Sequence, residues 1–196
     1  MSDWLHALRT ELENKQARGL MRQFSPLQHD GVWVQALETE HRMLNLSGND
    51  YLGLAADESL RARFWQSELA QSQMLGSSSS RLLTGSYPIY HQLERLMAAR
   101  FQSEAVLLFN SGYHANIGIL PAISNKRTLL LLDKFVHASL IDGARLSAAD
   151  YLRYQHNDYQ HLEQLLEQHH DAYERIIVVT ESIFSMDGDC AALTRL

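Results

Sequence analysis

Three polar segments of this sequence each follow an apolar run that is typical of a buried β-strand. Residues 110–113 follow AVLLF, His137 comes shortly after TLLLLD, and residues 181–189 follow IIVVT. In open α/β sheets, ligands bind beyond the carboxyl ends of the strands, where loops and helix starts present free N–H groups. We therefore expect the three segments to line one cleft.

The first segment, Asn110-Ser111-Gly112-Tyr113, leads into a predicted helix and is suited to bind an anion. The backbone amides of Gly112, Tyr113 and His114 would be free at the helix start and could hold a phosphate. From this tetrapeptide alone, a helix cap at Ser111 with a turn at Gly112 is the simpler explanation.

The second and third segments supply a planar ring and polar side chains. His137 could stack on an aromatic cofactor, although a histidine at a helix start often only hydrogen-bonds to backbone. In the third segment, Glu181 and Ser185 are the expected ligand contacts, whereas residues 187–189 read as a turn. An anion site, a flat ring and hydroxyl or carboxylate groups together predict a phosphorylated aromatic cofactor.

Two further segments, residues 47–54 and 76–85, are predicted to be binding loops. The second contains a run of four serines, for which a flexible linker is the alternative. The sequence predicts no metal site, because it contains one cysteine and no HExxH spacing. The four histidines at 156, 161, 169 and 170 are interpreted as part of a solvated helix face.

The elements that must position these groups alternate between helix and strand. Residues 3–18 have helical apolar spacing, and residues 32–47 contain two short strands around a turn at 39–41. After Gly53 the chain alternates, which predicts an α/β fold with a mainly parallel sheet between helices. The strands are expected at AVLLF, TLLLLD, YLRYQ and IIVVT, with helices at LERLMAARF, YHANIGIL, HASLIDGARL, around residues 162–166 and, as a beginning only, at CAALTRL.

Composition excludes several classes of function. The 196 residues are 45% hydrophobic, which is enough for a real core, and the net charge is -6 without a basic stripe. We therefore expect no nucleic-acid partner. The sequence shows no export signal and no apolar run long enough to span a membrane, so a cytoplasmic location is expected.

The segments SGNDYLGL, SRLLTG, FNSGYHAN, DKFVHASL, HND and TESIFSMDGD, in this order, resemble the α-oxoamine synthases over essentially the whole chain. The resemblance implies a fold-type I pyridoxal-phosphate enzyme, with an arm and part of a small domain at 1–45 and the first part of the large domain at 46–196. It further implies a homodimer with active sites at the interface. Such enzymes condense an amino acid with an acyl thioester and release carbon dioxide.

Carried over by motif, the resemblance implies a role for each matching residue. Gly112 and Tyr113 would hold the phosphate through their amides, and His137 would stack on the pyridine ring. Ser185 would bond near the ring oxygen, and Glu181 would lie close to the cofactor. Asn49 would lie near the substrate carboxylate, and Arg22 would meet the carboxylate of the acyl substrate.

The segments SSSSRLLTG and FNSGYHANIGILPA are most similar to the biotin branch of the family, which implies L-alanine and a pimeloyl thioester as substrates. The glycine acetyltransferase branch is the rival. Members of the family are about twice as long, so we expect the Schiff-base lysine to lie beyond Leu196 and this chain alone to be inactive. A non-catalytic binding or dimerisation module of the same ancestry is the alternative.

Overall fold

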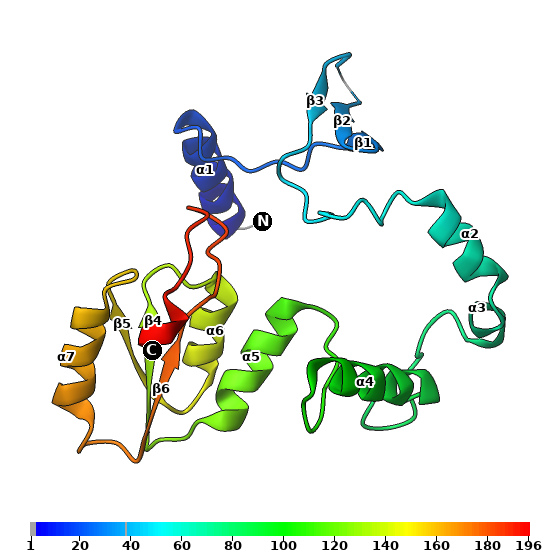
Figure 1. The fold of residues 1–196 in the computed structure, drawn as a ribbon. Coiled ribbons are helices and arrows are strands. Elements are labelled where there is room, and N and C mark those ends of the chain that lie inside the picture. The colour runs from blue at the N-terminus through cyan, green and yellow to red at the C-terminus, as the bar shows by residue number, and fades with distance from the viewer. Residues whose placement is uncertain (1–2, 38) are drawn as a thin grey trace. The chain divides into compact units, whose positions relative to one another are not determined.

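The computed structural model describes residues 3–37 and 39–196, which divide into two compact units (Figure 1). The first unit ends at Ser78 and the second runs from Ser79 to Leu196. The second unit contains the parallel strands and the three polar segments at residues 110–113, at His137 and at residues 181–189. The expected domain boundary after residue 45 stays a prediction.

The first unit opens with helix α1 (Asp3–Ala17), as the apolar spacing predicted. An antiparallel sheet follows, with the strand order β1-β2-β3. Strands β2 (Trp33–Ala36) and β3 (Arg42–Leu44) confirm the two expected strands, whereas β1 (Leu27–Asp30) was not predicted. Glu38, the last residue of the first expected strand, lies outside the described residues.

Two short helices complete the first unit. Helix α2 (Glu58–Gln66) is capped by Asp57, whose side chain accepts a hydrogen bond from the Leu60 amide. Helix α3 (Glu68–Ser72) is capped in the same way by Ser67. The segments 47–54 and 76–85 contain neither helix nor strand, so both are loops as predicted.

The second unit is built around a parallel sheet with the order β5-β4-β6, which confirms the predicted α/β class. Its elements in chain order are α4 (Pro88–Phe101), α5 (Gly112–Ile123), β4 (Thr128–Asp133), α6 (Ala138–Leu146), β5 (Asp150–Tyr154), α7 (Tyr159–His169), β6 (Arg175–Val179) and the single 3-10 turn η1 (Leu193–Arg195).

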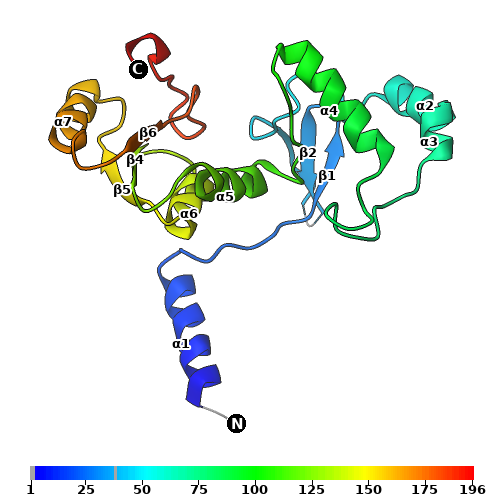
Figure 2. The same ribbon diagram turned by 90° about the horizontal axis from the view of Figure 1, so that it is seen from below.

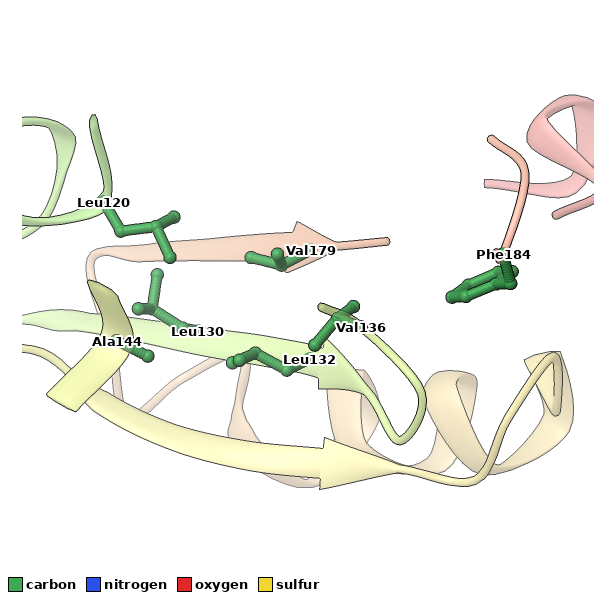
Figure 3. Close-up of a cluster of buried hydrophobic side chains, with 7 residues drawn as sticks. All are labelled: Leu120, Leu130, Leu132, Val136, Ala144, Val179 and Phe184. Carbon is green, nitrogen blue, oxygen red and sulfur yellow. The ribbon is translucent and has the colours of Figure 1, made fainter. Parts of the chain in front are cut away.

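The central strand β4 separates two apolar layers, and every one of its residues is buried. Successive side chains of a strand point to opposite faces. Leu130 and Leu132 pack on one face, in a cluster that includes Leu120 of α5 and Ala144 of α6 (Figure 3). Leu129 and Leu131 pack on the other face with Leu162 of α7. The sheet therefore lies between two helical layers, which Figure 2 also shows.

The expected strand at AVLLF does not form among the described residues, because residues 105–109 have no neighbouring strand. The backbone of Leu108 bonds to side chains instead: its N–H donates to Glu94 Oε1 at 3.1 Å, and its carbonyl accepts from Arg81 at 3.4 Å. Arg81 and Glu94 also form an ion pair at 2.8 Å. The segment is held beside α4 without a sheet ladder.

The prediction of a regular helix at CAALTRL was also wrong. Only the 3-10 turn η1 forms there. Ile183 and Cys190 make an isolated antiparallel bridge, so the residues before η1 fold back on the segment that follows β6. Cys190 therefore pairs with Ile183 where a helix was expected.

The helices of the described residues are short. The longest, α1, has 15 residues. Within residues 3–37 and 39–196, no helix is both long and apolar enough to cross a membrane.

Candidate functional site

The carboxyl ends of β4 and β6 bring His137 and Glu181 together. The two strands are parallel neighbours, so they end at the same edge of the sheet. His137 follows β4 as the N-cap of α6, and Glu181 comes two residues after β6. The backbone N–H of His137 donates a hydrogen bond to Glu181 Oε1. This bond ties the start of α6 to the segment after β6.

The imidazole of His137 is fixed by a chain of hydrogen bonds on one side only. Asn116 Nδ2 donates to Ser139 Oγ at 2.8 Å, and Ser139 Oγ lies 2.7 Å from His137 Nδ1. The Ser139 backbone N–H donates to Nδ1 at 3.2 Å, which makes Nδ1 an acceptor, and the Ser139 hydroxyl can donate to the same nitrogen while it accepts from Asn116. Nε2 therefore carries the proton. His137 is exposed, so its ring is accessible.

The start of α5 presents two free backbone amides. Ser111 caps the helix, and its hydroxyl accepts from the His114 amide at 3.2 Å, so this third predicted amide is occupied. The amides of Gly112 and Tyr113 have no partner among the described residues. Free N–H groups at a helix start, together with the helix dipole, attract anions.

Gly112 itself leaves open space at this helix start. A Cβ atom built at Gly112 would meet no atom of the described residues within 4 Å, and Gly112 does not have a positive φ. Neither the backbone conformation nor the packing among those residues requires glycine at this position. The space over Gly112 suits the close approach of a bound group.

Tyr113 links α5 to α6 through its side chain. Its hydroxyl donates to Asp142 Oδ2 at 3.1 Å, and this hydrogen bond raises the pKa of the Tyr113 phenol above its ordinary value. The two helices also approach closely at Gly143, where a Cβ would lie 2.6 Å from the Asn116 carbonyl oxygen. This close packing brings Asn116 to the Ser139 hydroxyl, and so to His137.

Ser185 lies on a tight turn in the segment after β6, which we call the 181–189 loop. Within the loop, the Phe184 amide donates to the Asp189 carbonyl at 2.9 Å, and the Gly188 amide donates to the Phe184 carbonyl at 2.8 Å. Gly188 has a positive φ of 73°, which favours glycine. Phe184 is buried, whereas Ser185 is exposed and has no hydrogen-bond partner among the described residues.

Sequence reasoning missed a histidine held between two carboxylates at the same sheet edge. His156 Nδ1 lies 2.8 Å from Asp133 Oδ1, and His156 Nε2 lies 2.8 Å from Asp189 Oδ2. The interpretation of His156 as part of a solvated face was therefore wrong, because its side chain is only 17% exposed. Its position two residues after β5 was the available signal, since that is another strand end.

The charge of His156 follows from these contacts. Burial alone would lower the pKa of the imidazole, but the hydrogen bonds to Asp133 and Asp189 outweigh burial and raise the pKa. Both ring nitrogens face carboxylate oxygens, which accept hydrogen bonds when ionised. The geometry therefore matches an imidazolium that donates to both carboxylates.

Arg22 and Asn49 belong to the first unit. Arg22 lies between α1 and β1, Asn49 lies between β3 and α2, and both are exposed. Their expected contacts with substrate stay predictions. In the serine run, Ser78 has a positive φ of 49°, so one serine adopts the conformation that glycine takes more easily.

The second unit thus offers an anion-binding helix start, an accessible imidazole with a fixed tautomer, and an ordered polar loop. The anion-binding start of α5 and the imidazole at the start of α6 lie on helices that pack against each other. The backbone N–H of His137 joins the start of α6 to the 181–189 loop through its bond to Glu181. Such a set suits a planar group that carries a phosphate.

Comparison with known proteins agrees with this chemistry. The family model described as "Aminotransferase class I and II" matches residues 41–196. An 8-amino-7-oxononanoate synthase from Haemophilus ducreyi is 58% identical over 181 residues, which cover 91% of this chain and 46% of the relative. The chain spans about half the length of the curated relatives it matches.

Solved structures share the fold. A serine palmitoyltransferase from Sphingomonas wittichii aligns with a TM-score of 0.81 and 26% identity, covering 98% of this chain and 48% of that one. A serine palmitoyltransferase from S. paucimobilis, solved with a bound PLP–myriocin aldimine, aligns with a TM-score of 0.80 and 24% identity. That alignment covers 96% of this chain and 47% of that protein.

Proposed function

Because this chain belongs to the aminotransferase class I and II family, we propose that it forms the cofactor-binding half of a pyridoxal-phosphate enzyme that joins L-alanine to a pimeloyl thioester. The product is 8-amino-7-oxononanoate, with release of carbon dioxide and the thiol. The 58% identity to the Haemophilus ducreyi synthase supports this substrate pair. The observation that carries the proposal is the pairing of a free helix start with the fixed His137 imidazole.

The described residues fit pyridoxal phosphate. The Gly112 and Tyr113 amides bind the phosphate, for which the open space over Gly112 leaves room. His137 stacks on the pyridine ring with its exposed imidazole. Glu181 accepts the His137 backbone N–H and so fixes the start of α6, and the Ser185 hydroxyl bonds near the ring oxygen.

The cofactor supplies the electron sink for breaking and making bonds at the amino acid's α-carbon. The residues of this chain bind and orient. His137 keeps Nδ1 bonded to Ser139, so its ring cannot rotate freely and its Nε2–H remains available. A fixed ring favours one face-to-face arrangement and reduces the entropy lost when the cofactor binds.

Two residues of the first unit are proposed to bind the carboxylates of the substrates. Asn49 contacts the carboxylate of the amino acid. Arg22 pairs with the terminal carboxylate of the pimeloyl group, since an arginine fork suits a carboxylate. An acetyl donor carries no such carboxylate, so Arg22 separates this proposal from a glycine acetyltransferase.

None of the lysines within the described residues lies among the proposed cofactor contacts. Lys15 pairs with Glu11 on α1, and Lys134 donates to Gln155 Oε1. Turnover requires a lysine that tethers the cofactor and moves the α-proton. We therefore propose that the chain alone binds the cofactor weakly and has no activity.

An absorbance titration with pyridoxal phosphate tests the proposal. It is run on this chain and on a version extended with the second half of the Haemophilus ducreyi relative. L-Alanine and pimeloyl thioester are then added, and carbon dioxide and the amino-ketone product are measured. The expected result is a new visible absorbance band and product in the extended protein only.

A parallel assay with glycine and acetyl-CoA separates the two branches of the family. Product from that pair, and none from L-alanine, would replace the proposed substrates. Arg22→Gln is expected to raise KM for the pimeloyl thioester at least about tenfold, with little change for L-alanine. If neither protein responds to pyridoxal phosphate, the proposed function is wrong.

A further inference from the structure

We propose that His156 is a positioning residue: the bridge Asp133–His156–Asp189 holds the 181–189 loop against the end of β4 and thereby sets the position of Ser185 at the cofactor. The first part concerns the loop alone. The second part rests on the proposed function.

The bridge joins three segments that are far apart in the sequence. Asp133 is the last residue of β4 and is fully buried, His156 comes two residues after β5, and Asp189 closes the 181–189 loop. Both nitrogen–oxygen distances are 2.8 Å, and the two carboxylates lie at opposite nitrogens of one ring. An imidazolium can donate one hydrogen bond to each carboxylate from its two ring nitrogens. A glutamine amide has a single nitrogen and cannot reproduce this geometry.

Two phenylalanines fix the plane of the His156 ring. Phe135 stacks on it with centroids 4.4 Å apart and an interplanar angle of 22°. Phe184 meets it edge-on at 4.5 Å and 88°. Phe184 is 2% exposed and directly precedes Ser185, so the ring is anchored to the loop by packing as well as by charge.

Asn157 connects the same two carboxylates a second time. Its backbone N–H donates to Asp133 Oδ2 at 3.0 Å, and its side-chain Nδ2 donates to Asp189 Oδ2 at 2.9 Å. Asn157 has a positive φ of 53°, a conformation that asparagine adopts more readily than most residues. This strained backbone lets one dipeptide reach both carboxylates.

The loop is thus fastened at both ends. At its start, Glu181 accepts the His137 N–H, and at its end Asp189 is held by His156 and Asn157. Between the two ends, exposed Ser185 has no hydrogen bond among the described residues. Its position therefore depends on the loop, and the loop depends on the bridge. Without the positive charge of His156, the carboxylates of Asp133 and Asp189 would repel each other.

Amide hydrogen exchange measures loop order directly and needs no cofactor. His156→Gln is compared with the unchanged protein and with His170→Gln, an exposed histidine beyond the end of α7. In His156→Gln, the Phe184 and Gly188 amides are expected to exchange at least about tenfold faster, while the β4 amides exchange at the same rate. His170→Gln is expected to change neither set.

The second readout is the affinity for pyridoxal phosphate in the extended protein, which is expected to fall at least about fivefold in His156→Gln only. Unchanged loop exchange would overturn the proposal. Faster loop exchange with unchanged cofactor affinity would overturn the second part. If the unchanged protein binds no cofactor while the loop loosens in the variant, the proposed function fails and the loop bridge stands.

Asp189→Asn tests the same bridge with a smaller change, because the Asp189 side chain is 42% exposed and keeps its shape. It is expected to speed loop exchange in the same amides. This variant decides the question if His156→Gln does not fold.

Discussion

His137 is held on its Nδ1 side by Ser139 and is exposed elsewhere, so its side chain contributes more to binding than to folding. We expect His137→Ala in the extended protein to weaken pyridoxal phosphate binding about tenfold, since aromatic stacking contributes about 0.5–1.5 kcal/mol beyond burial. The free energy of unfolding should fall by only about 1 kcal/mol, through loss of the helix cap. Titration and urea unfolding measure the two effects, with His170→Ala as the control. Unchanged affinity would remove His137 from the site.

The charge on His156 predicts a pH dependence of stability. Its pKa in the folded protein is raised above the ordinary value of 6.5, so its contribution is fully present below that value and is lost as pH rises through the folded pKa. Hydrogen bonds to charged groups are each worth about 1.5–3 kcal/mol. Urea unfolding of the unchanged protein and His156→Gln should therefore differ more at pH 6 than at pH 9. An equal difference at both pH values would contradict the imidazolium.

His156 also shows what the sequence conceals. Its partners lie 23 and 33 positions away, and neither distance follows a recognisable motif. The strand-end rule that selected His137 and Glu181 applies to β5 as well, and it would have drawn attention to His156. The bond from His137 to Glu181 is not visible in the sequence, because it joins residues on two different strand ends. The contact between Asn116 and Ser139 is not visible either, because it depends on how closely α5 and α6 pack.

At the element scale, helices and buried parallel strands were predictable, because apolar residues recur at helical spacing in the helices and form continuous runs in the strands. TLLLLD became β4 and IIVVT became most of β6. AVLLF has the same apolar character, but a strand also needs a neighbour, and periodicity does not reveal one. β1 was missed because LQHD lacks apolar alternation, although the following Gly31, with a φ of 56°, marks the hairpin turn.

The packing around two glycines of α5 and α6 predicts different effects of alanine substitutions on stability. Gly143→Ala places a Cβ 2.6 Å from the Asn116 carbonyl oxygen, and we expect it to lower the free energy of unfolding by about 1–3 kcal/mol. Gly112→Ala meets nothing within 4 Å and should leave stability unchanged or raise it by about 0.5 kcal/mol. Urea unfolding of both variants provides the comparison. Equal destabilisation would show that the two helices pack differently.

At the scale of the whole molecule, large apolar side chains remain exposed in the second unit. Leu82 is 92% exposed, Met186 is 89% exposed and Ile183 is 65% exposed. The outer sides of β5 and β6 also lack a strand partner among the described residues. Exposed apolar groups and unpaired strand edges both promote association.

We therefore predict that the protein forms a homodimer that covers the 181–189 loop. Met186 and Ile183 are exposed apolar residues of that loop, and Met186 directly follows the proposed cofactor contact Ser185. Met186→Glu puts a charge where an apolar contact is expected, and it should lower the dimer fraction in light scattering. Gln168→Glu adds the same charge at an exposed position of α7 and should leave the dimer intact. A monomer in the unchanged protein would contradict the homodimer, whereas a dimer insensitive to Met186→Glu would move the interface away from this loop.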